Sequence, residues 1–564
     1  MCLFLKPHDE EHGKKSFLKR FYYYFNIGFS ATTTKYRKSL VFLGKRGHRW
    51  ITVGIILVST CVLFGLMKVI PTGFVPQEDS GGVMGSITLP PGSSLERSDS
   101  VVHAVMEMAF EIPEVKHAGS LSGMSFMSGT GSSYGSVMIK MDHWDNRDIT
   151  ANEIAAILTE KTSSIKNATF LFFGTPTIQG FGLSSGVAVN LQDRTGGDIY
   201  DFYNVTNDFI AKMSAREEVM TAMTTFNPNF PPQKQLEVNM AKIKDAGITL
   251  SDVMGTLQAY IGSQYISNFN LYGKQYRVMI QAAPEYRSKL DDLDGLYVKT
   301  ASGEMAPVTS FLTITDVTGP ETRTRFNLYS SMELTIIPNY AGGYSSGDVI
   351  KAIEEITLPT GYSYEFSDMT REEAESSSQT VLIFGLCLIF VYLLLAALYE
   401  SYILPLAVIF SLPVGLAGVF IFLSAFGLSQ GITNNIYVQI SLIMLIGLLA
   451  KNAILIVEYA IQRRQQGMSI VDAAVNGAVA RFRPILMTSF AFIFGLLPLA
   501  VSTGGAGAIG NRSIGISAIG GMLIGTLIGV LVIPSLYIIF QSIQDKFSKS
   551  GMINSNDEFI NKQQ

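Results

Sequence analysis

Residues 437–460 read YVQISLIMLIGLLAKNAILIVEYA, an apolar run of membrane-spanning length that contains a lysine. Crossing about 30 Å of hydrocarbon takes roughly 20 helical residues, and backbone groups cannot stay unpaired in lipid. The run is therefore predicted to be a transmembrane helix. Lys451 lies about nine residues from its C-terminal end, which is about 14 Å at 1.5 Å per residue and beyond the reach of a lysine that extends its amine to the membrane surface. A charge at this depth is costly and indicates a functional site.

Five further runs have the same character, and they lie at 50–70, 379–398, 403–426, 484–502 and 514–540. The composition agrees, since 48% of residues are hydrophobic and only 16% are charged, whereas about 25% charged residues are usual in soluble domains. A formal net charge of −4 gives no indication of nucleic-acid binding. We therefore predict an α-helical membrane protein with six transmembrane helices.

Lysine and arginine gather before the first run, between the fourth and fifth runs, and in the tail, which predicts that these segments are cytoplasmic. Aromatic and basic residues at 17–26 indicate an interfacial helix, with a solvated linker as the alternative. The expected layout is a cytoplasmic segment (1–49), a transmembrane helix (50–70), an extracytoplasmic domain (71–378), five transmembrane helices (379–540) and a cytoplasmic tail (541–564).

The extracytoplasmic part shows strand and helix patterns in alternation. A strand at 83–89 precedes a helix at 95–110, and a second copy has a strand at 187–193 before a helix at 198–213. This order predicts α+β subdomains of the ferredoxin-like type. Residues 240–310 break the rhythm and are predicted to form a separate docking subdomain, whose helix in GITLSDVMGTLQAYI would begin at a Ser251 cap.

Lys451 has no evident counter-charge in this sequence. Glu458 lies seven residues further on, about 10 Å along the helix axis, and the interiors of the other five runs contain no Asp or Glu. Either burial keeps the lysine neutral, or its carboxylate comes from another polypeptide. We favour the second explanation, because a proton pump needs a titrating carboxylate whose charge a lysine can balance.

Four motifs follow one another along the chain: IPTGFVPQEDSGG (70–82), LAALYESYILPLAVIFSLPVGLAG (395–418), GLLAKNAILIVEYA (447–460) and RFRPILMTSFAFIFGLLPL (481–499). Over about residues 1–545 the sequence resembles resistance-nodulation-division (RND) exporters, most closely the hydrophobe/amphiphile efflux branch of multidrug pumps. The resemblance implies the C-terminal half of a twelve-helix subunit, spans seven to twelve, with MCLFLKP as the end of span six.

The resemblance also implies roles for membrane residues. Lys451 would face a pair of aspartates in a missing N-terminal half, and its neighbour Asn452, with Thr488 and Arg481, would join the proton relay. On the residues alone, Thr488 is as readily explained by a hydrogen bond to its own helix backbone. The resemblance further implies a secondary transporter rather than an enzyme, driven by proton antiport without a cofactor.

Assembly and location follow from the same resemblance. We expect a homotrimer in the bacterial inner membrane, with both termini cytoplasmic, joined to a periplasmic adaptor and an outer-membrane channel and exporting hydrophobic small molecules.

A substrate pocket is expected in the extracytoplasmic domain. The stretch GSLSGMSFMSGTGSSYGSVMIKM (119–141) is similar to the flexible switch loop of the family with its flanking strands, in which Met124, Phe126 and Met138 would meet substrates. Phe173, in TFLFFGTPTI, would lie near the entrance pocket. Methionine is polarizable and adaptable, which suits promiscuous binding, and the glycines of 119–135 favour mobility. Ordinary core packing is the alternative for each of these residues.

Two other functions compete with a proton-driven multidrug exporter. The methionines Met124, Met127 and Met138 suggest a heavy-metal exporter, because thioethers suit Cu(I). The missing acids suggest instead a non-transporting fragment or an assembly partner.

Overall fold

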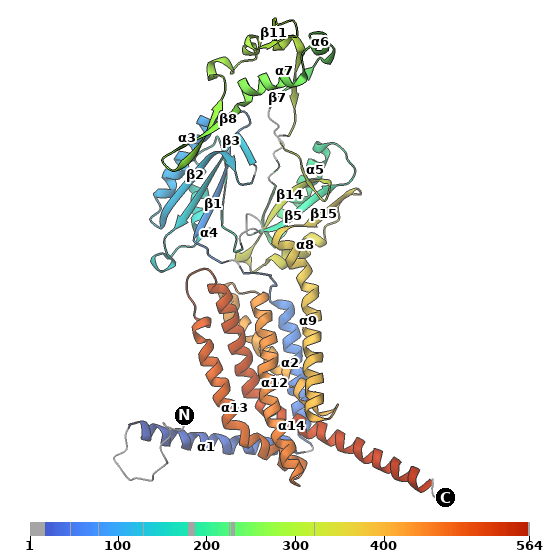
Figure 1. Cartoon of the computed structure of the whole chain (residues 1–564). Helices are drawn as coiled ribbons and strands as arrows, with labels where there is room; N and C mark the ends of the chain where they lie inside the picture. Colours follow the sequence, from blue (N-terminus) through green and yellow to red (C-terminus); the bar gives the residue numbers. More distant parts are fainter. Residues whose placement is uncertain are drawn as a thin grey trace. The chain divides into compact units, whose positions relative to one another are not determined.

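The computed structural model describes residues 17–561 apart from 46, 77, 128, 179–185, 225, 227–231 and 321. The predicted end of a preceding span, in residues 1–7, lies outside the described residues. The chain divides into two compact units, of which the smaller comprises Pro90–Ser94 and Asn227–Arg323. The larger unit contains a helical bundle and two β-sheets, and Figure 1 follows both units along the chain.

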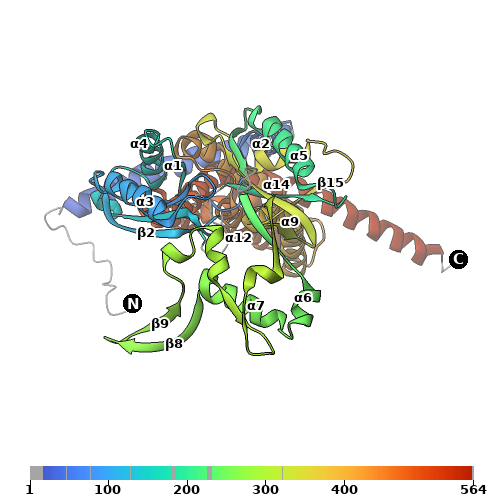
Figure 2. The same cartoon turned by 90° about the horizontal axis from the view of Figure 1, so that it is seen from above.

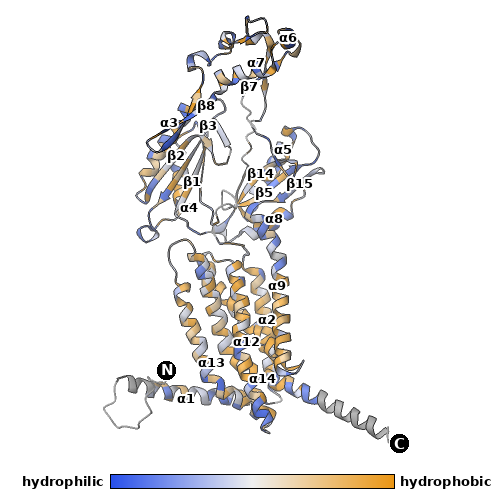
Figure 3. Cartoon of the chain, viewed as in Figure 1, coloured by the Kyte–Doolittle hydropathy of each residue, from blue (hydrophilic) through white to orange (hydrophobic). Residues whose placement is uncertain are grey.

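Within the described part of the chain, six helical stretches are long and apolar enough to cross a membrane. They form the bundle that is predominantly orange in the hydropathy colouring of Figure 3. The stretches are α2 (Arg49–Val69), α9 (Asp368–Tyr399), Leu404–Gln430, α12 (Ile436–Gln465), α13 (Ile470–Ala500) and α14 (Ala508–Asn561), of which Ala508–Lys546 is the apolar part. Each overlaps one of the apolar runs in the sequence.

Two of these stretches differ from the helices expected. The run at 403–426 is not one helix but α10 (Leu404–Ile409) followed by α11 (Leu412–Phe422), because Pro413 in the first turn of α11 cannot donate a backbone hydrogen bond to α10. The fifth run does not begin at Pro484. Its helix starts at Ile470 behind a Ser469 cap, and the proline lies inside it.

The centre of the bundle is formed by α11, α12 and α14. About 61% of the apolar window of α14 is buried, against 6% for α9, so α9 lies at the periphery of this chain. Glycines let α11 and α14 approach closely. A Cβ atom at Gly520 would lie 2.3 Å from Cβ of Phe422 and 2.8 Å from the carbonyl oxygen of Gly418. Such contacts are typical of small residues between membrane helices.

The first helix, α1 (Phe17–Gly44), packs against α13 and α14. The Tyr36 hydroxyl donates to the carbonyl oxygen of Val530 at 2.9 Å, and its ring stacks on Phe482 with centroids 4.3 Å apart. Leu40, at 2% exposure, continues this inward face one turn later. Aromatic and aliphatic side chains thus attach α1 to the bundle.

The first sheet of the larger unit has the strand order β2-β3-β1-β4, and all its pairs are antiparallel. Its elements are β1 (Gly82–Thr88), α3 (Leu95–Phe110), β2 (Val115–Ser125), β3 (Gly129–Met141), α4 (Ala151–Thr162) and β4 (Thr169–Gly174). Apolar side chains of α3 and α4 form one core with one face of this sheet. The chain order is therefore β-α-β-β-α-β.

The second sheet has the same order apart from one additional short strand, β13. Its elements are β5 (Val187–Asp193), α5 (Ile199–Ser214), β6 (Val219–Thr224), β13 (Thr324–Phe326), β14 (Tyr329–Pro338), α8 (Ser346–Glu354) and β15 (Tyr362–Phe366). The strands run β13-β14-β5-β15, with β6 also paired to β14. The strand β15 leads directly into α9, so this sheet is continuous in sequence with the bundle.

The smaller unit has its own core around Ile243, Val253 and Phe311. Its elements are β7 (Pro232–Val238), α6 (Met240–Asp245), α7 (Leu250–Leu257), β8 (Gln264–Leu271), β9 (Lys274–Ile280), β10 (Tyr297–Lys299), β11 (Met305–Pro307) and β12 (Leu312–Thr318). Strands β8 and β9 form a two-stranded ribbon (Figure 2).

The expected Ser251 cap of α7 is wrong. Thr249 caps the helix, because its hydroxyl accepts from the Asp252 amide while the Asp252 carboxylate accepts from the Thr249 amide.

Candidate functional site

Lys451 lies on an exposed stripe of an otherwise packed helix. Ile440, Gly447 and Lys451 are exposed along α12, at spacings that place them on one side, while most of the helix packs against α11, α13 and α14. Within the described ranges, no carboxylate forms an ion pair with Lys451. The expectation of a cation buried by this chain is therefore corrected: the lysine faces outward from it.

The next residue, Asn452, faces the opposite way into the bundle. At 5% exposure, its amide nitrogen donates to the Ser489 hydroxyl of α13 at 3.3 Å. The same hydroxyl accepts from Thr526 of α14 at 2.9 Å. Ser489 and Thr526 are themselves only 1% and 4% exposed. A buried polar network thus ties three helices together directly behind Lys451.

Thr488 makes the local hydrogen bond that its position allows. Its hydroxyl donates to the carbonyl oxygen of Ile485 at 3.0 Å, and the residue is exposed on α13. One residue along a helix turns the side chain by about 100°, so Thr488 points outward where Ser489 points inward. The sequence reasoning chose Thr488 and missed Ser489 and Thr526. The sequence LMTS holds two neighbouring hydroxyl residues, Thr488 and Ser489, and this pair could have drawn attention to Ser489.

Arg481 is not brought to Lys451. Its guanidinium carbon lies 4.5 Å from the centre of the Tyr459 ring, a cation–π contact between α13 and α12. Tyr459 is eight residues beyond Lys451, about 12 Å along the helix. Arg463 lies over the same ring at 5.3 Å. The structure therefore assigns Arg481 to a packing contact near the end of α12.

A second candidate site is the open face of the first sheet, on the side away from α3 and α4. Met84 of β1 is the cross-strand partner of both Met138 on β3 and Phe173 on β4. Their sequence neighbours Val83, Ile139 and Phe172 belong to the helix-facing core, so this row points to the other face. Met138 is 46% exposed and Phe173 only 8%. Sequence reasoning found both ends of the row and missed Met84.

The segment 119–135 is a β-hairpin whose strands are the flanking strands expected around a switch loop, and they reach Ser125 and resume at Gly129. Strands β2 and β3 occupy most of it, and its serines and glycines pair across the ladder with a register shift between Ser122 and Met124. At the tip the chain folds onto the open face. The carbonyl oxygen of Met124 accepts from the Ser136 hydroxyl at 2.9 Å, and the Phe126 amide donates to the same hydroxyl at 3.2 Å. Ser136 precedes Met138 by two residues, so the tip lies beside the methionine row.

Comparison with known proteins identifies the family of this chain. The model for the AcrB/AcrD/AcrF family matches residues 1–541. The chain belongs to the AcrB/AcrD/AcrF family. It is 34% identical to the toluene efflux pump membrane transporter TtgB of Pseudomonas putida over 549 residues, which are 96% of this chain and 51% of that protein.

Two Escherichia coli proteins are similar at the same level. Multidrug resistance protein MdtF is 31% identical over 93% of this chain and 50% of its own length. Multidrug export protein AcrF is 31% identical over 95% of this chain and 52% of its own length. The chain thus spans about half the length of the curated relatives it matches.

The polar network predicts unequal effects for two neighbouring hydroxyls of this family member. Ser489→Ala removes the partner of two buried groups and is expected to lower the free energy of unfolding by about 1–3 kcal/mol. Thr488→Ala, the matched control, removes an exposed hydroxyl that bonds its own helix and should change it little. Denaturation of both variants in detergent measures the difference, and equal losses would contradict the network.

Proposed function

We propose that this chain is one half of a proton-driven efflux transporter and that it supplies the cationic side of the proton site. The single observation that carries the proposal is the outward-facing Lys451 at membrane depth on α12. A charged amine does not remain in hydrocarbon without polar partners, so this stripe is covered by another polypeptide that carries a carboxylate. Membership of the AcrB/AcrD/AcrF family supports an exporter.

The missing partner is an N-terminal half with intramembrane aspartates, and this chain corresponds to spans seven to twelve. A carboxylate beside Lys451 alternates between an ionised and a neutral form, and the ammonium stabilises the ionised form. Thr488 lies on the adjacent helix α13, at a depth in the membrane similar to that of Lys451. Its hydroxyl donates to Ile485, and its lone pairs can still accept from an ammonium or a water. Asn452 orients α12 from behind through Ser489.

The substrates are hydrophobic or amphiphilic compounds that bind on the open face of the first sheet. Met138, Phe173, Met124 and Phe126 would contact them, together with Met84. Names of relatives such as the toluene efflux pump TtgB and the multidrug export protein AcrF support this class of substrate. The two β-α-β-β-α-β units are of the ferredoxin-like type, and the unit around 227–323 is a docking subdomain.

In the cell, the chain lies in a bacterial inner membrane with six transmembrane helices and both termini in the cytoplasm. Residues 71–378 are extracytoplasmic. The subunit works as a homotrimer with a periplasmic adaptor and an outer-membrane channel. The distribution of Lys and Arg supports the orientation, and the family supports the assembly.

Removing the charge of Lys451 tests the proposed proton site. The 564-residue chain alone is expected to confer no drug resistance, and co-expression with an N-terminal half that carries two intramembrane aspartates is expected to confer it. In that pair Lys451→Met should reduce resistance to the level of cells without the pump. Lys68→Met, at the exposed end of α2, is the matched control and should retain resistance.

Three results would contradict the proposal. Drug export by the isolated chain would mean that its proton carrier lies elsewhere. Full resistance with Lys451→Met would remove the lysine from the proton cycle. A pair that assembles and exports nothing would favour an assembly partner without transport.

The open face is tested by two methionines of β3 that face opposite sides. Met138→Ala is expected to change the relative resistance to different drugs several-fold without changing the melting temperature, because Met138 is exposed. Met141, at 3% exposure in the core under α3 and α4, is the control. Met141→Ala should lower stability by about 2–5 kcal/mol and reduce resistance to all drugs alike. An unchanged drug profile for Met138→Ala would mean that Met138 does not contact substrates and serves only in packing.

A further inference from the structure

Glu78 joins the extracytoplasmic sheet to the first turn of α14. Its carboxylate oxygens accept from the Gly510 amide at 2.7 Å and from the Ile509 amide at 3.1 Å. Amides in the first turn of a helix have no partner within the helix, and a negative charge there is favoured by the helix dipole. One side chain thus satisfies two backbone donors of a membrane helix from a residue that lies 431 positions before Ile509.

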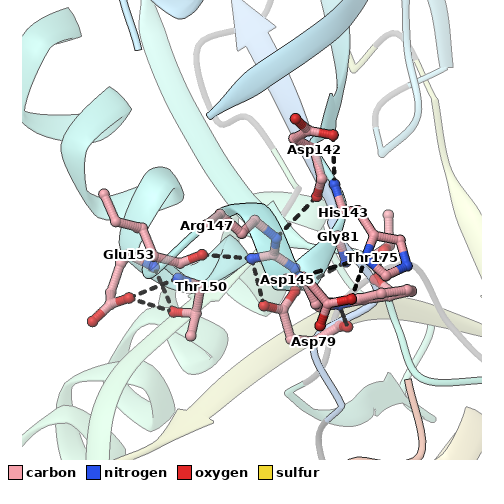
Figure 4. Close-up of polar contacts among 12 residues, drawn as sticks. Asp79, Gly81, Asp142, His143, Asp145, Arg147, Thr150, Glu153 and Thr175 are labelled. Atoms are coloured by element: carbon pink, nitrogen blue, oxygen red, sulfur yellow. Dashed lines mark hydrogen bonds and ion pairs between the residues drawn. The ribbon is translucent and has the colours of Figure 1, made fainter. Parts of the chain in front are cut away.

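Glu78 itself is held by the segment that follows β4. Its amide donates to the Thr177 hydroxyl at 3.1 Å, and the next residue, Asp79, binds Arg147 at 2.7 Å and the Gly81 amide at 2.9 Å (Figure 4). The Arg147 side chain is only 2% exposed, so this ion pair is well shielded from water. Adjacent acidic residues therefore have different partners. Asp79 binds Arg147 and the Gly81 amide just before β1, and Glu78 binds the first turn of α14.

A tryptophan makes a second contact where Glu78 and Asp79 meet the start of α14. The Trp144 ring nitrogen donates to the carbonyl oxygen of Asp79 at 2.9 Å. In the loop before α14, Gly504 and Gly505 have φ of +74° and +95°, and a Cβ at Gly504 would lie 3.2 Å from Cβ of Trp144. Glycine meets both requirements, so the loop passes close to the tryptophan.

The packing around Glu78 is incomplete. A cavity of about 200 Å³ lies at the joint and is lined by Glu78, Asp79, Thr177 and Ile509, among others. Ala508 is 5% exposed and Ile509 packs against the bundle core, so the two hydrogen bonds of the carboxylate add to the van der Waals contacts of the helix end.

The same helix reaches the membrane network. Thr526 of α14 donates to Ser489, which also accepts from Asn452, the neighbour of Lys451. Seventeen residues separate Ile509 from Thr526, about 26 Å of helix. The helix α14 therefore runs from the sheet joint to the residues behind the lysine.

We propose that Glu78 is a positioning residue that couples the sheet to the membrane site through α14. A change in charge at Lys451 shifts α14 through Asn452, Ser489 and Thr526, and Glu78 transmits this shift to the sheet that carries the open face. The coupling role rests on the proposed transport function, whereas the attachment of α14 by Glu78 does not.

The test compares two glutamates with the same local role. Glu78→Gln keeps the size of the side chain and removes the charge, so one of the two amides loses its acceptor. Glu153→Gln is the matched control, because Glu153 also accepts from an amide at a helix start, that of Thr150 at 2.7 Å, but at the extracytoplasmic helix α4. These hydrogen bonds hold the pKa of the Glu153 carboxyl below its usual value.

Two measurements separate attachment from coupling. In the full 564-residue chain, Glu78→Gln should raise the hydrogen–deuterium exchange of Ile509 and Gly510 at least threefold, and Glu153→Gln should leave it unchanged. In proteoliposomes with the assembled pair, Glu78→Gln should reduce drug-stimulated proton uptake at least tenfold while drug affinity stays unchanged. A merely structural residue would lower affinity and the amount of folded protein together.

Unchanged exchange at Ile509 and Gly510 in Glu78→Gln would overturn the attachment. Proton uptake equal to that of Glu153→Gln would overturn the coupling. If the unmodified pair takes up no protons on drug addition, the proposed function fails and the coupling with it, and the exchange result still decides whether Glu78 holds α14.

Discussion

A lysine at membrane depth that points away from its own chain constrains the rest of this structure. Placing an ammonium at the centre of a membrane helix costs about 3 kcal/mol on insertion scales, and the cost is offset only by a polar partner or water. Lys451 occupies the exposed stripe of α12, and the described ion pairs include none with it. We propose that another polypeptide covers the surface around it. The chain belongs to the AcrB/AcrD/AcrF family and spans about half the length of the relatives it matches.

The orientation of Lys451 is set by what lies behind it. Asn452, Ser489 and Thr526 form a buried network among α12, α13 and α14, and a rotation of α12 would leave these groups unpaired at a cost of about 1–3 kcal/mol each. Close glycine contacts between α11 and α14 add a rigid support on the other side. The same α14 begins beside Glu78, so one helix contacts both this network and the segment that leads into β1.

Much of this arrangement was readable from sequence, and the failures have physical causes. Long apolar runs indicate helices because lipid leaves the backbone no alternative, and Lys451 is conspicuous because charge is rare there. The inward direction of Ser489 is not readable, since a hydroxyl in an apolar helix suits either side until the neighbouring helices are placed. How far the strands extend into the expected switch loop at 119–135 is not readable, because glycine and serine weaken strand signals, while the pairing of β3 with both β1 and β2 sets the strand lengths. Thr249 and Ser251 are equally good caps, and only the reciprocal bond with Asp252 distinguishes them.

The most direct test of the central claim is the distance from the Lys451 amine to a carboxylate. Solid-state NMR on the assembled pair, with the lysine side-chain nitrogen labelled with ¹⁵N and the aspartate carboxyl carbons of the N-terminal half labelled with ¹³C, measures it in lipid bilayers. The account predicts a nitrogen–carbon distance of about 4 Å, as in an ion pair, at a pH where the carboxylate is ionised. A lysine nitrogen with no labelled carboxyl carbon within about 6 Å would contradict it, because two unit charges separated by more than an ion-pair distance do not offset the cost of burying the amine.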